Sequence, residues 1–279
     1  MKRLRLCGVV PGLLALTVLI FLHPAHAAGR DRVEAFLEVT GFGVALDSIA
    51  LSASDAPSML GREPGDFGHD WTRVSREVFD TGVMRSMALG FLENALTEEL
   101  LDHAAGFYAS DLGRRLVEAE NIAHMDDNDE AKRKDGEEIV AGLLKQGSPR
   151  LEYLKRMNTA IDSSDTAVRA VQEIQVRFLM AAASAGVIDL RLDEPALRAV
   201  MKENEGDMRR QMAVSALANA AHVYRAFSDA DMRAYAEALE DERMQQVYEL
   251  MNAVQWEIMA NRFEVLAHRM ANLHPGQDL

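Results

Sequence analysis

Hydrophobic residues recur at every third or fourth position along most of this chain, which is the spacing of one face of an α-helix. One apolar stripe runs over residues 168–182 and another over 247–258, and a shifted stripe continues over 259–273. No stretch of strand length alternates β-branched and polar residues. We therefore predict an all-α fold, built as a multi-helix bundle.

Capping signals in the sequence predict where individual helices begin. An N-cap residue with proline or an acid close behind it occurs at Ser148-Pro149, Ser164-Asp165 and Asp193-Glu194-Pro195. Ser228 with Asp231 predicts a capping box. Residues 52–68, rich in proline and glycine, are predicted to be a loop, and the charged run 125–138 is either a linker or the solvated face of a helix. Pro275-Gly276 is expected to end the last helix.

Two helical halves are predicted, 28–145 and 146–279, following a leader over 1–27. Leu96-Thr97-Glu98 precedes Phe227-Ser228-Asp229 by 131 residues, and each triplet combines an apolar residue, a hydroxyl cap and an acid. The pattern after both is a short helix, a break and a second helix, although few residues are identical. A degenerate repeat and two unrelated amphipathic helix pairs both fit this pattern.

The leader is predicted from residues 1–27. Three cations precede an apolar run at 6–22, and Ala25 and Ala27 form an A-x-A cleavage pattern. An uncleaved membrane anchor is the alternative. Glycine and proline leave only 13–22 unbroken, which is short for a membrane span. We expect cleavage near Ala27, a periplasmic location and no membrane span in the mature protein.

The composition of the chain excludes some kinds of chemistry and some kinds of partner. Cys7 is the single cysteine of the chain and lies in the leader, so disulfides and thiol catalysis are excluded from the mature protein. Loss of the leader's three cations changes the net charge from −14 to −17. Such a surface disfavours nucleic acid and suits a basic envelope partner, a cationic ligand or divalent cations. Acidity that serves only solubility is the plainer explanation.

One phrase of the sequence resembles a known family. Thr97-Glu98-Glu99-Leu100 and Phe107-Tyr108-Ala109-Ser110-Asp111-Leu112-Gly113-Arg114-Arg115 are similar to the motif of the domain of unknown function 2059 family. Asp111 stands where that family has proline, and Leu100 stands at its glutamate position. The resemblance covers residues 96–115 firmly, and it implies a secreted, helical bacterial protein with no established activity.

The same phrase also has a structural interpretation. Thr97 and Ser110 are predicted to cap successive helices, and Gly113 is predicted to let those helices pack closely. Capping and burial account for each residue, so a helix–turn–helix corner is favoured over a binding site.

No catalytic, cofactor-binding or metal-binding residue is assigned. The histidines 69, 103, 124, 222, 268 and 274 lack metal-ligand spacing, and His222 reads as a core or edge residue. An EF-hand register places ligands at Asp126, Asn128, Glu130 and Glu137, but Ala131 replaces the turn glycine. Met201, Met208 and Met212 could bind copper(I), yet core packing is the more common role of such a stripe.

These observations predict a non-catalytic binding or scaffolding protein of the cell envelope, with a basic protein as its partner. An acid-rimmed apolar groove would fit that function. Two alternatives stay open. A carboxylate-dependent hydrolase of envelope polymers needs two acids across a cleft, and a small-molecule or metal carrier needs an enclosed pocket or converging ligands.

Overall fold

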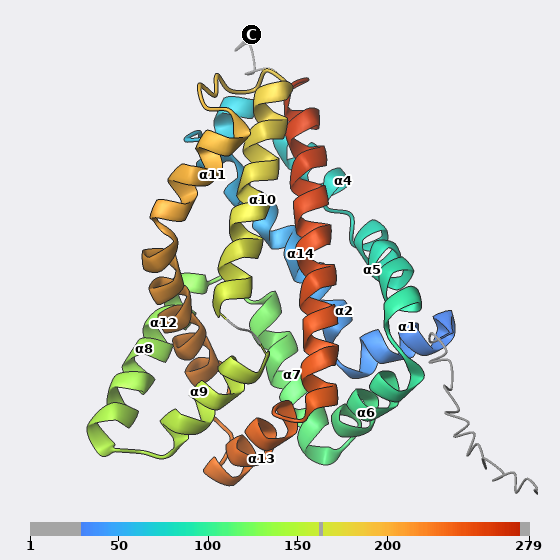
Figure 1. The fold of residues 1–279 in the computed structure, drawn as a ribbon, viewed down its shortest axis with the longest axis vertical. Coiled ribbons are helices and arrows are strands. Elements are labelled where there is room, and N and C mark those ends of the chain that lie inside the picture. Colours follow the sequence, from blue (N-terminus) through green and yellow to red (C-terminus); the bar gives the residue numbers. More distant parts are fainter. Residues whose placement is uncertain (1–28, 162–163, 274–279) are drawn as a thin grey trace, which may run out of the picture.

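The computed structural model describes residues 29–161 and 164–273, and within these ranges it consists of helices and connecting turns without a β-strand (Figure 1). The all-α prediction is confirmed. The predicted leader and the expected stop at Pro275-Gly276 lie outside the described residues. The α-helices are α1 (Arg30–Val39), α2 (Phe42–Ser48), α3 (Ala56–Met59), α4 (Trp71–Val78), α5 (Thr81–Ala95), α6 (Glu98–Tyr108), α7 (Asp111–Met125), α8 (Asp129–Gln146), α9 (Arg150–Ile161), α10 (Ser164–Ser184), α11 (Glu194–Glu203), α12 (Glu205–Val223), α13 (Asp229–Leu239) and α14 (Glu242–Met270).

Helix α14 is the centre of the fold. Its apolar stripe is buried along the whole length of the helix, from Met244 to Met270. It packs along α10, as Figure 1 shows, and also contacts α4, α5, α6 and α9. The two stripes predicted over 247–258 and 259–273 therefore lie largely on one continuous helix, and α14 packs against helices of both predicted halves.

The region predicted as a loop at 52–68 is a correction to the sequence analysis. It contains the end of a 3₁₀ helix η1 (Ile49–Asp55), helix α3 and a second 3₁₀ helix η2 (Pro64–Phe67). Prolines that suggested a loop sit near helix starts, where their missing N–H costs no hydrogen bond: Pro57 is the second residue of α3 and Pro64 the first of η2.

The charged run at 125–138 is mostly helical, as one of its two interpretations predicted. Helix α7 ends at Met125, and α8 begins at Asp129 with Asn128 as its N-cap. Helix α8 lies against α12, and Gly136 makes the contact close, since a Cβ there would meet the carbonyl oxygen of Ala218 at 2.0 Å. This pair forms the left-hand side of the molecule in Figure 1.

The predicted helix starts are found close to their expected positions. Asp193 caps α11 and Ser228 caps α13 within a complete capping box. Helix α10 begins at Ser164, and α9 begins at Arg150, one residue later than the predicted Pro149. Such local signals suffice because each cap is decided by residues within one turn.

The two pairs α6–α7 and α13–α14 share their local pattern. Thr97 and Ser228 cap the short helices, and Ser110 and Asp241 cap the helices that follow. The similarity is one of pattern, and a duplication stays a prediction. Buried side chains from both predicted halves form one hydrophobic cluster. None of the helices in the described ranges is long and apolar enough to span a membrane.

Candidate functional site

A cavity of about 1160 Å³ lies between elements of the two predicted halves. Its walls come from η1, α4, α7 and the start of α8 on one side, and from α9, α12, α13 and α14 on the other. One part of the lining is apolar, with Trp71, Phe79, Met157 and Leu239. The remainder is rich in carboxyl, hydroxyl and amide groups, so the cavity offers a ligand both an apolar and a polar surface.

Glu120 on α7 is the carboxyl group at the inner end of the polar wall. Its Oε1 atom accepts hydrogen bonds from the hydroxyls of Tyr224 at 2.7 Å and Tyr235 at 3.0 Å. The Tyr235 hydroxyl in turn lies 3.2 Å from the hydroxyls of Tyr108 and Tyr248, and those two hydroxyls also bond to each other. Four tyrosines, three of them in helices α6, α13 and α14 and one at the C-cap of α12, thus form one network with a single carboxylate.

The protons of this network can be assigned by counting donors. Each tyrosine hydroxyl has one proton. Tyr224 and Tyr235 use theirs on Glu120, so the oxygen of Tyr235 can only accept from Tyr108 or Tyr248. The chain of hydroxyls therefore points toward the carboxylate, and such aligned hydrogen bonds strengthen one another in a poorly solvated site.

Burial sets the ionisation of the cluster. It raises the pKa of Glu120, and the hydrogen bonds from Tyr224 and Tyr235 oppose that rise. Burial also raises the pKa values of Tyr108, Tyr224 and Tyr235 well above the ordinary tyrosine range, and the Glu120 charge adds to the effect. The tyrosines therefore stay protonated donors at neutral pH, and Glu120 is the group of the network that titrates first.

The local sequence explains how α7 and the tyrosines are held in place. Ser110 caps α7, and Gly113 lets this helix pass against the backbone of Tyr108 at the end of α6. Arg150, only 8% exposed, donates to the carbonyls of Tyr224 and Phe227 and pairs with Asp229 at 3.0 Å. This arginine fixes the turn between α12 and α13, which begins with Tyr224 and leads into the helix that carries Tyr235.

Stacking adds a second constraint on Tyr235. Its ring is parallel to that of Phe107, with centroids 5.8 Å apart, and it meets the ring of Tyr224 edge-on at 5.7 Å. Phe107 and Tyr108 belong to the phrase that resembles the known family. That phrase therefore supplies a network member as well as the helix corner predicted for it.

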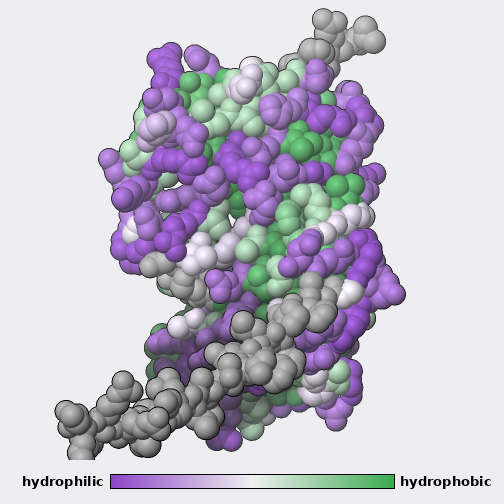
Figure 2. All heavy atoms as spheres, turned by 45° about the vertical axis from the view of Figure 1, so that its right-hand side comes forward, coloured by the Kyte–Doolittle hydropathy of each residue, from purple (hydrophilic) through white to green (hydrophobic). Residues whose placement is uncertain are grey.

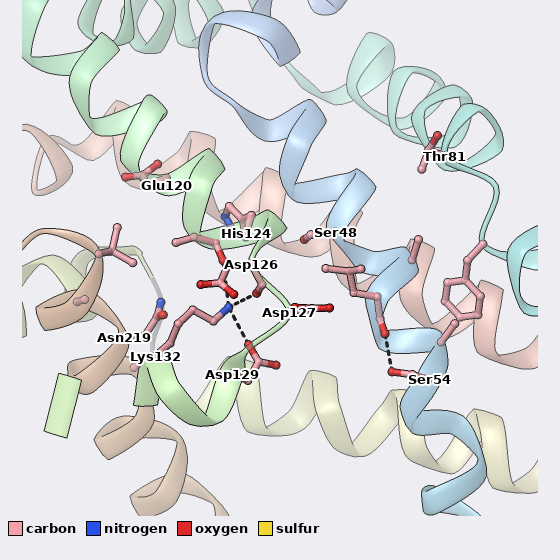
Figure 3. Close-up of a pocket in the computed structure, with 18 of the residues that line it drawn as sticks. Ser48, Ser54, Thr81, Glu120, His124, Asp126, Asp127, Asp129, Lys132 and Asn219 are labelled. Atoms are coloured by element: carbon pink, nitrogen blue, oxygen red, sulfur yellow. Dashed lines mark hydrogen bonds and ion pairs between the residues drawn. The ribbon is translucent and has the colours of Figure 1, made fainter. Parts of the chain in front are cut away.

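Around Lys132 the cavity lining becomes acidic. Asp126 and Asp129 lie beside this lysine at the end of α7 and the start of α8, while Asp127 on the same turn points away from it, and all three lie apart from Glu120 (Figure 3). The Lys132 ammonium pairs with Asp129 at 2.8 Å and donates to the carbonyls of Ala123 and Asp126. Its side chain is only 12% exposed, so most of its hydrogen-bonding capacity is used within this turn.

His124, one helical turn beyond Glu120, is the histidine of this wall. Burial lowers its pKa, and the nearby Lys132 charge lowers it further. The imidazole is therefore neutral at neutral pH and adds no positive charge to the cavity.

The other residues that the sequence offered as metal ligands do not come together in one site. Glu137 lies in helix α8 and pairs with Arg133, so the run from Asp126 does not fold as a calcium loop. His222 is partly buried and bonds to Asp135 at 2.5 Å, which fits its interpretation as an edge residue. In the part of the chain that the structure describes, no three histidines or acids are grouped to hold a metal ion.

Sequence reasoning missed Glu120 and its tyrosines. Glu120 lies two residues after the exposed Glu118 in a helix of mixed polarity, so nothing local distinguishes the two acids. The chain has only five tyrosines, and four of them belong to this network. The small number of tyrosines, and the position of one of them, Tyr108, in the family-like phrase, are the only features of the sequence that point to this network.

Comparison with known proteins finds a match to a family model over one segment of the chain and gives no activity. No curated protein and no solved structure matches the chain. The matched family segment spans residues 83–141 and so includes Glu120 and Lys132 but not Tyr224 or Tyr235. Residues 83–141 match the model of a family described as an uncharacterized protein conserved in bacteria (DUF2059), which confirms the resemblance predicted from residues 96–115.

Proposed function

We propose that this protein is a small-molecule-binding protein of the bacterial cell envelope that holds its ligand in the central cavity. The observation that carries the proposal is the cavity itself, whose volume of about 1160 Å³ is somewhat larger than the roughly 300–1,000 Å³ of most small-molecule sites. Its apolar wall and convergent polar groups are the combination that such sites use for affinity and orientation. This is the carrier alternative of the sequence analysis.

Two features favour this function over the scaffold first predicted. That hypothesis expected an apolar groove rimmed with acids, whereas the acids here line a cavity that also contains apolar side chains. On the face seen in Figure 2, most side chains are polar and hydrophobic ones reach the surface in separate patches. This pattern suits a ligand held inside the molecule better than a partner held on that face.

The geometry of Glu120 favours binding over hydrolysis. Glycan hydrolysis needs one carboxyl as a proton donor and a second across the scissile bond. The hydrogen-bond partners of Glu120 are tyrosine hydroxyls that donate to it, and Figure 3 shows it apart from the aspartates around Lys132. These donated hydrogen bonds favour the ionised form of Glu120 and oppose the rise in its pKa that burial causes.

Native mass spectrometry tests the proposal. The full-length gene is expressed with a C-terminal tag, and the exported protein is examined for a bound small molecule. Ala216 lines the cavity and is exposed, so Ala216→Trp should occupy the space while preserving the fold. Ala213→Trp, also exposed on α12 but outside the lining, is the matched control.

We expect a stoichiometric mass increment in the wild type and in Ala213→Trp, and its loss in Ala216→Trp. A ligand at a hundredfold excess over its Kd should also stabilise the protein by about 2.7 kcal/mol. If the wild type carries no small molecule and no fraction of a cell-envelope extract raises its unfolding temperature, the proposal fails. Release of a cleaved product would instead support the hydrolase.

The envelope location rests on the leader predicted over residues 1–27. The same exported protein should begin near Ala28 and appear in the periplasmic fraction. An intact N-terminus in the cytoplasmic fraction would contradict this part of the proposal.

A further inference from the structure

The charge of Glu120 has no cationic partner in the described part of the chain. Both hydrogen bonds to the carboxylate reach Oε1, and no described group donates to Oε2. Burial and two tyrosine hydroxyls account for the electrostatic environment of this carboxyl, without a contribution from lysine or arginine. Glu120 is partly buried in the cavity wall, and a carboxylate that is withdrawn from water is normally paired with a cation, so this one differs from the usual pattern.

The rest of the lining shares the negative charge. Across the described residues, the cavity wall contains five carboxyl groups and two basic side chains, Arg76 and Lys132. Lys132 is already paired with Asp129. His124 is held neutral by burial and by Lys132. The potential inside the cavity is therefore negative, and low-dielectric walls strengthen such a field.

Apolar and aromatic groups complete the environment. Trp71, Phe79 and Leu239 offer a surface to a hydrocarbon body. The partly exposed ring of Tyr248 also belongs to the lining, and aromatic rings attract organic cations. A hydrated metal ion would leave the apolar wall unused, and an anion would meet repulsion from the carboxylates.

Resting on the proposed function, we propose that the ligand is an amphipathic organic cation, such as a primary amine with a hydrocarbon body, and that Glu120 is its counter-ion. The ammonium group would approach Oε2, the carboxylate oxygen that the tyrosines leave free. The tyrosine network fixes the orientation of the carboxylate before the ligand arrives, so little ordering is needed on binding.

Three probes with the same eight-carbon body but different head groups test the charge: octylamine, 1-octanol and octanoate. Their binding to the full chain is measured by calorimetry and by the fluorescence of Trp71, in a Trp256→Phe background that leaves one tryptophan in the protein. Octylamine should bind about tenfold more tightly than 1-octanol, because a hydrogen bond to a charged partner is worth that much. Octanoate should bind most weakly.

Two variants assign the preference to one carboxyl. Glu120→Gln preserves an acceptor for the tyrosines and removes the charge, and it should reduce the preference for the amine to near unity. Glu118→Gln, an exposed change on the same helix, should leave it unaltered. Ala216→Trp should weaken all three probes, which places their binding in the cavity.

The outcomes separate this inference from the function on which it rests. Equal binding of the three probes, or a preference that survives in Glu120→Gln, would overturn the cation assignment and leave a small-molecule cavity in place. Binding of none of the probes to the wild type would count against both. If Glu120→Gln does not fold, the ranking of the three probes on the wild type still decides the question.

Discussion

The hydroxyl of Tyr235 on α13 lies 3.0 Å from Oε1 of Glu120 on α7, a contact across 115 residues of sequence. Tyr224 reaches the same oxygen atom from the C-cap position of α12. These two bonds connect the predicted N-terminal half to the C-terminal half at the wall of the cavity. The site therefore exists only when both halves are folded together, so binding and global folding should be linked.

Removal of the Tyr235 hydroxyl should destabilise the protein. Tyr235→Phe takes away one of the two donors to Glu120, and a buried carboxylate that loses a donor costs about 1–3 kcal/mol. Urea unfolding followed by circular dichroism measures the loss. Tyr153→Phe is the control, because Tyr153 is a partly buried tyrosine outside this network. Equal effects of the two changes would contradict the assigned role.

The stability of the ligand-free protein should depend on the ionisation of Glu120. Because burial raises its pKa in the folded state, the folded protein holds this proton more tightly than the unfolded chain. Its contribution to stability is therefore greatest at low pH and is lost as the pH rises through the raised value.

Glu120→Gln should remove that component of the pH dependence. The variant should equal or exceed the wild type in stability at neutral pH, and its advantage should shrink toward mildly acidic pH. Urea titrations at a series of pH values measure the difference between the two proteins. The prediction would be refuted by a variant that is less stable than the wild type at neutral pH and whose free energy of unfolding changes with pH as that of the wild type does.

The elements of this fold were more predictable than its site, for a physical reason. The caps at Asp193 and Ser228 depend on residues within one helical turn, so the sequence displays them directly. The prediction of a loop at 52–68 is wrong because proline marks a helix start and a turn alike, and Pro57 and Pro64 lie at the starts of short helices.

The Glu120 network has no such local signal. Whether an acid in a helix is buried depends on which other helices cover it, and here the cover comes from α12, α13 and α14. Helical periodicity identifies a buried face but cannot place a distant tyrosine on it. One feature of the site, the acidic run beside Lys132, is visible in the sequence, although its position in a cavity wall is not.

Arg150 should contribute more to stability than a surface arginine of similar bonding. Arg150→Met leaves the carbonyls of Tyr224 and Phe227 without their donor in a poorly solvated turn, which should cost about 2–4 kcal/mol. Arg156→Met removes an exposed bidentate pair with Glu240 and should change stability little. Because the turn positions Tyr224, octylamine binding should weaken in the first variant only. Matching losses of stability in both variants would show that the turn does not depend on Arg150.

Gly113 and Gly142 should respond to alanine in opposite directions. A Cβ at Gly113 would lie 2.3 Å from the carbonyl oxygen of Phe107 and 2.5 Å from Cα of Tyr108. Neither atom belongs to a flexible side chain, so helices α6 and α7 would have to separate, at a cost of more than about 2 kcal/mol. Gly142 lies within α8 with open space around its Cβ direction, so alanine there should stabilise the helix by about 0.5–1 kcal/mol. Thermal and urea unfolding of the two variants measure both effects. Since the corner at Gly113 places Tyr108 and Glu120 relative to each other, Gly113→Ala should also weaken octylamine binding, whereas Gly142→Ala should leave it intact.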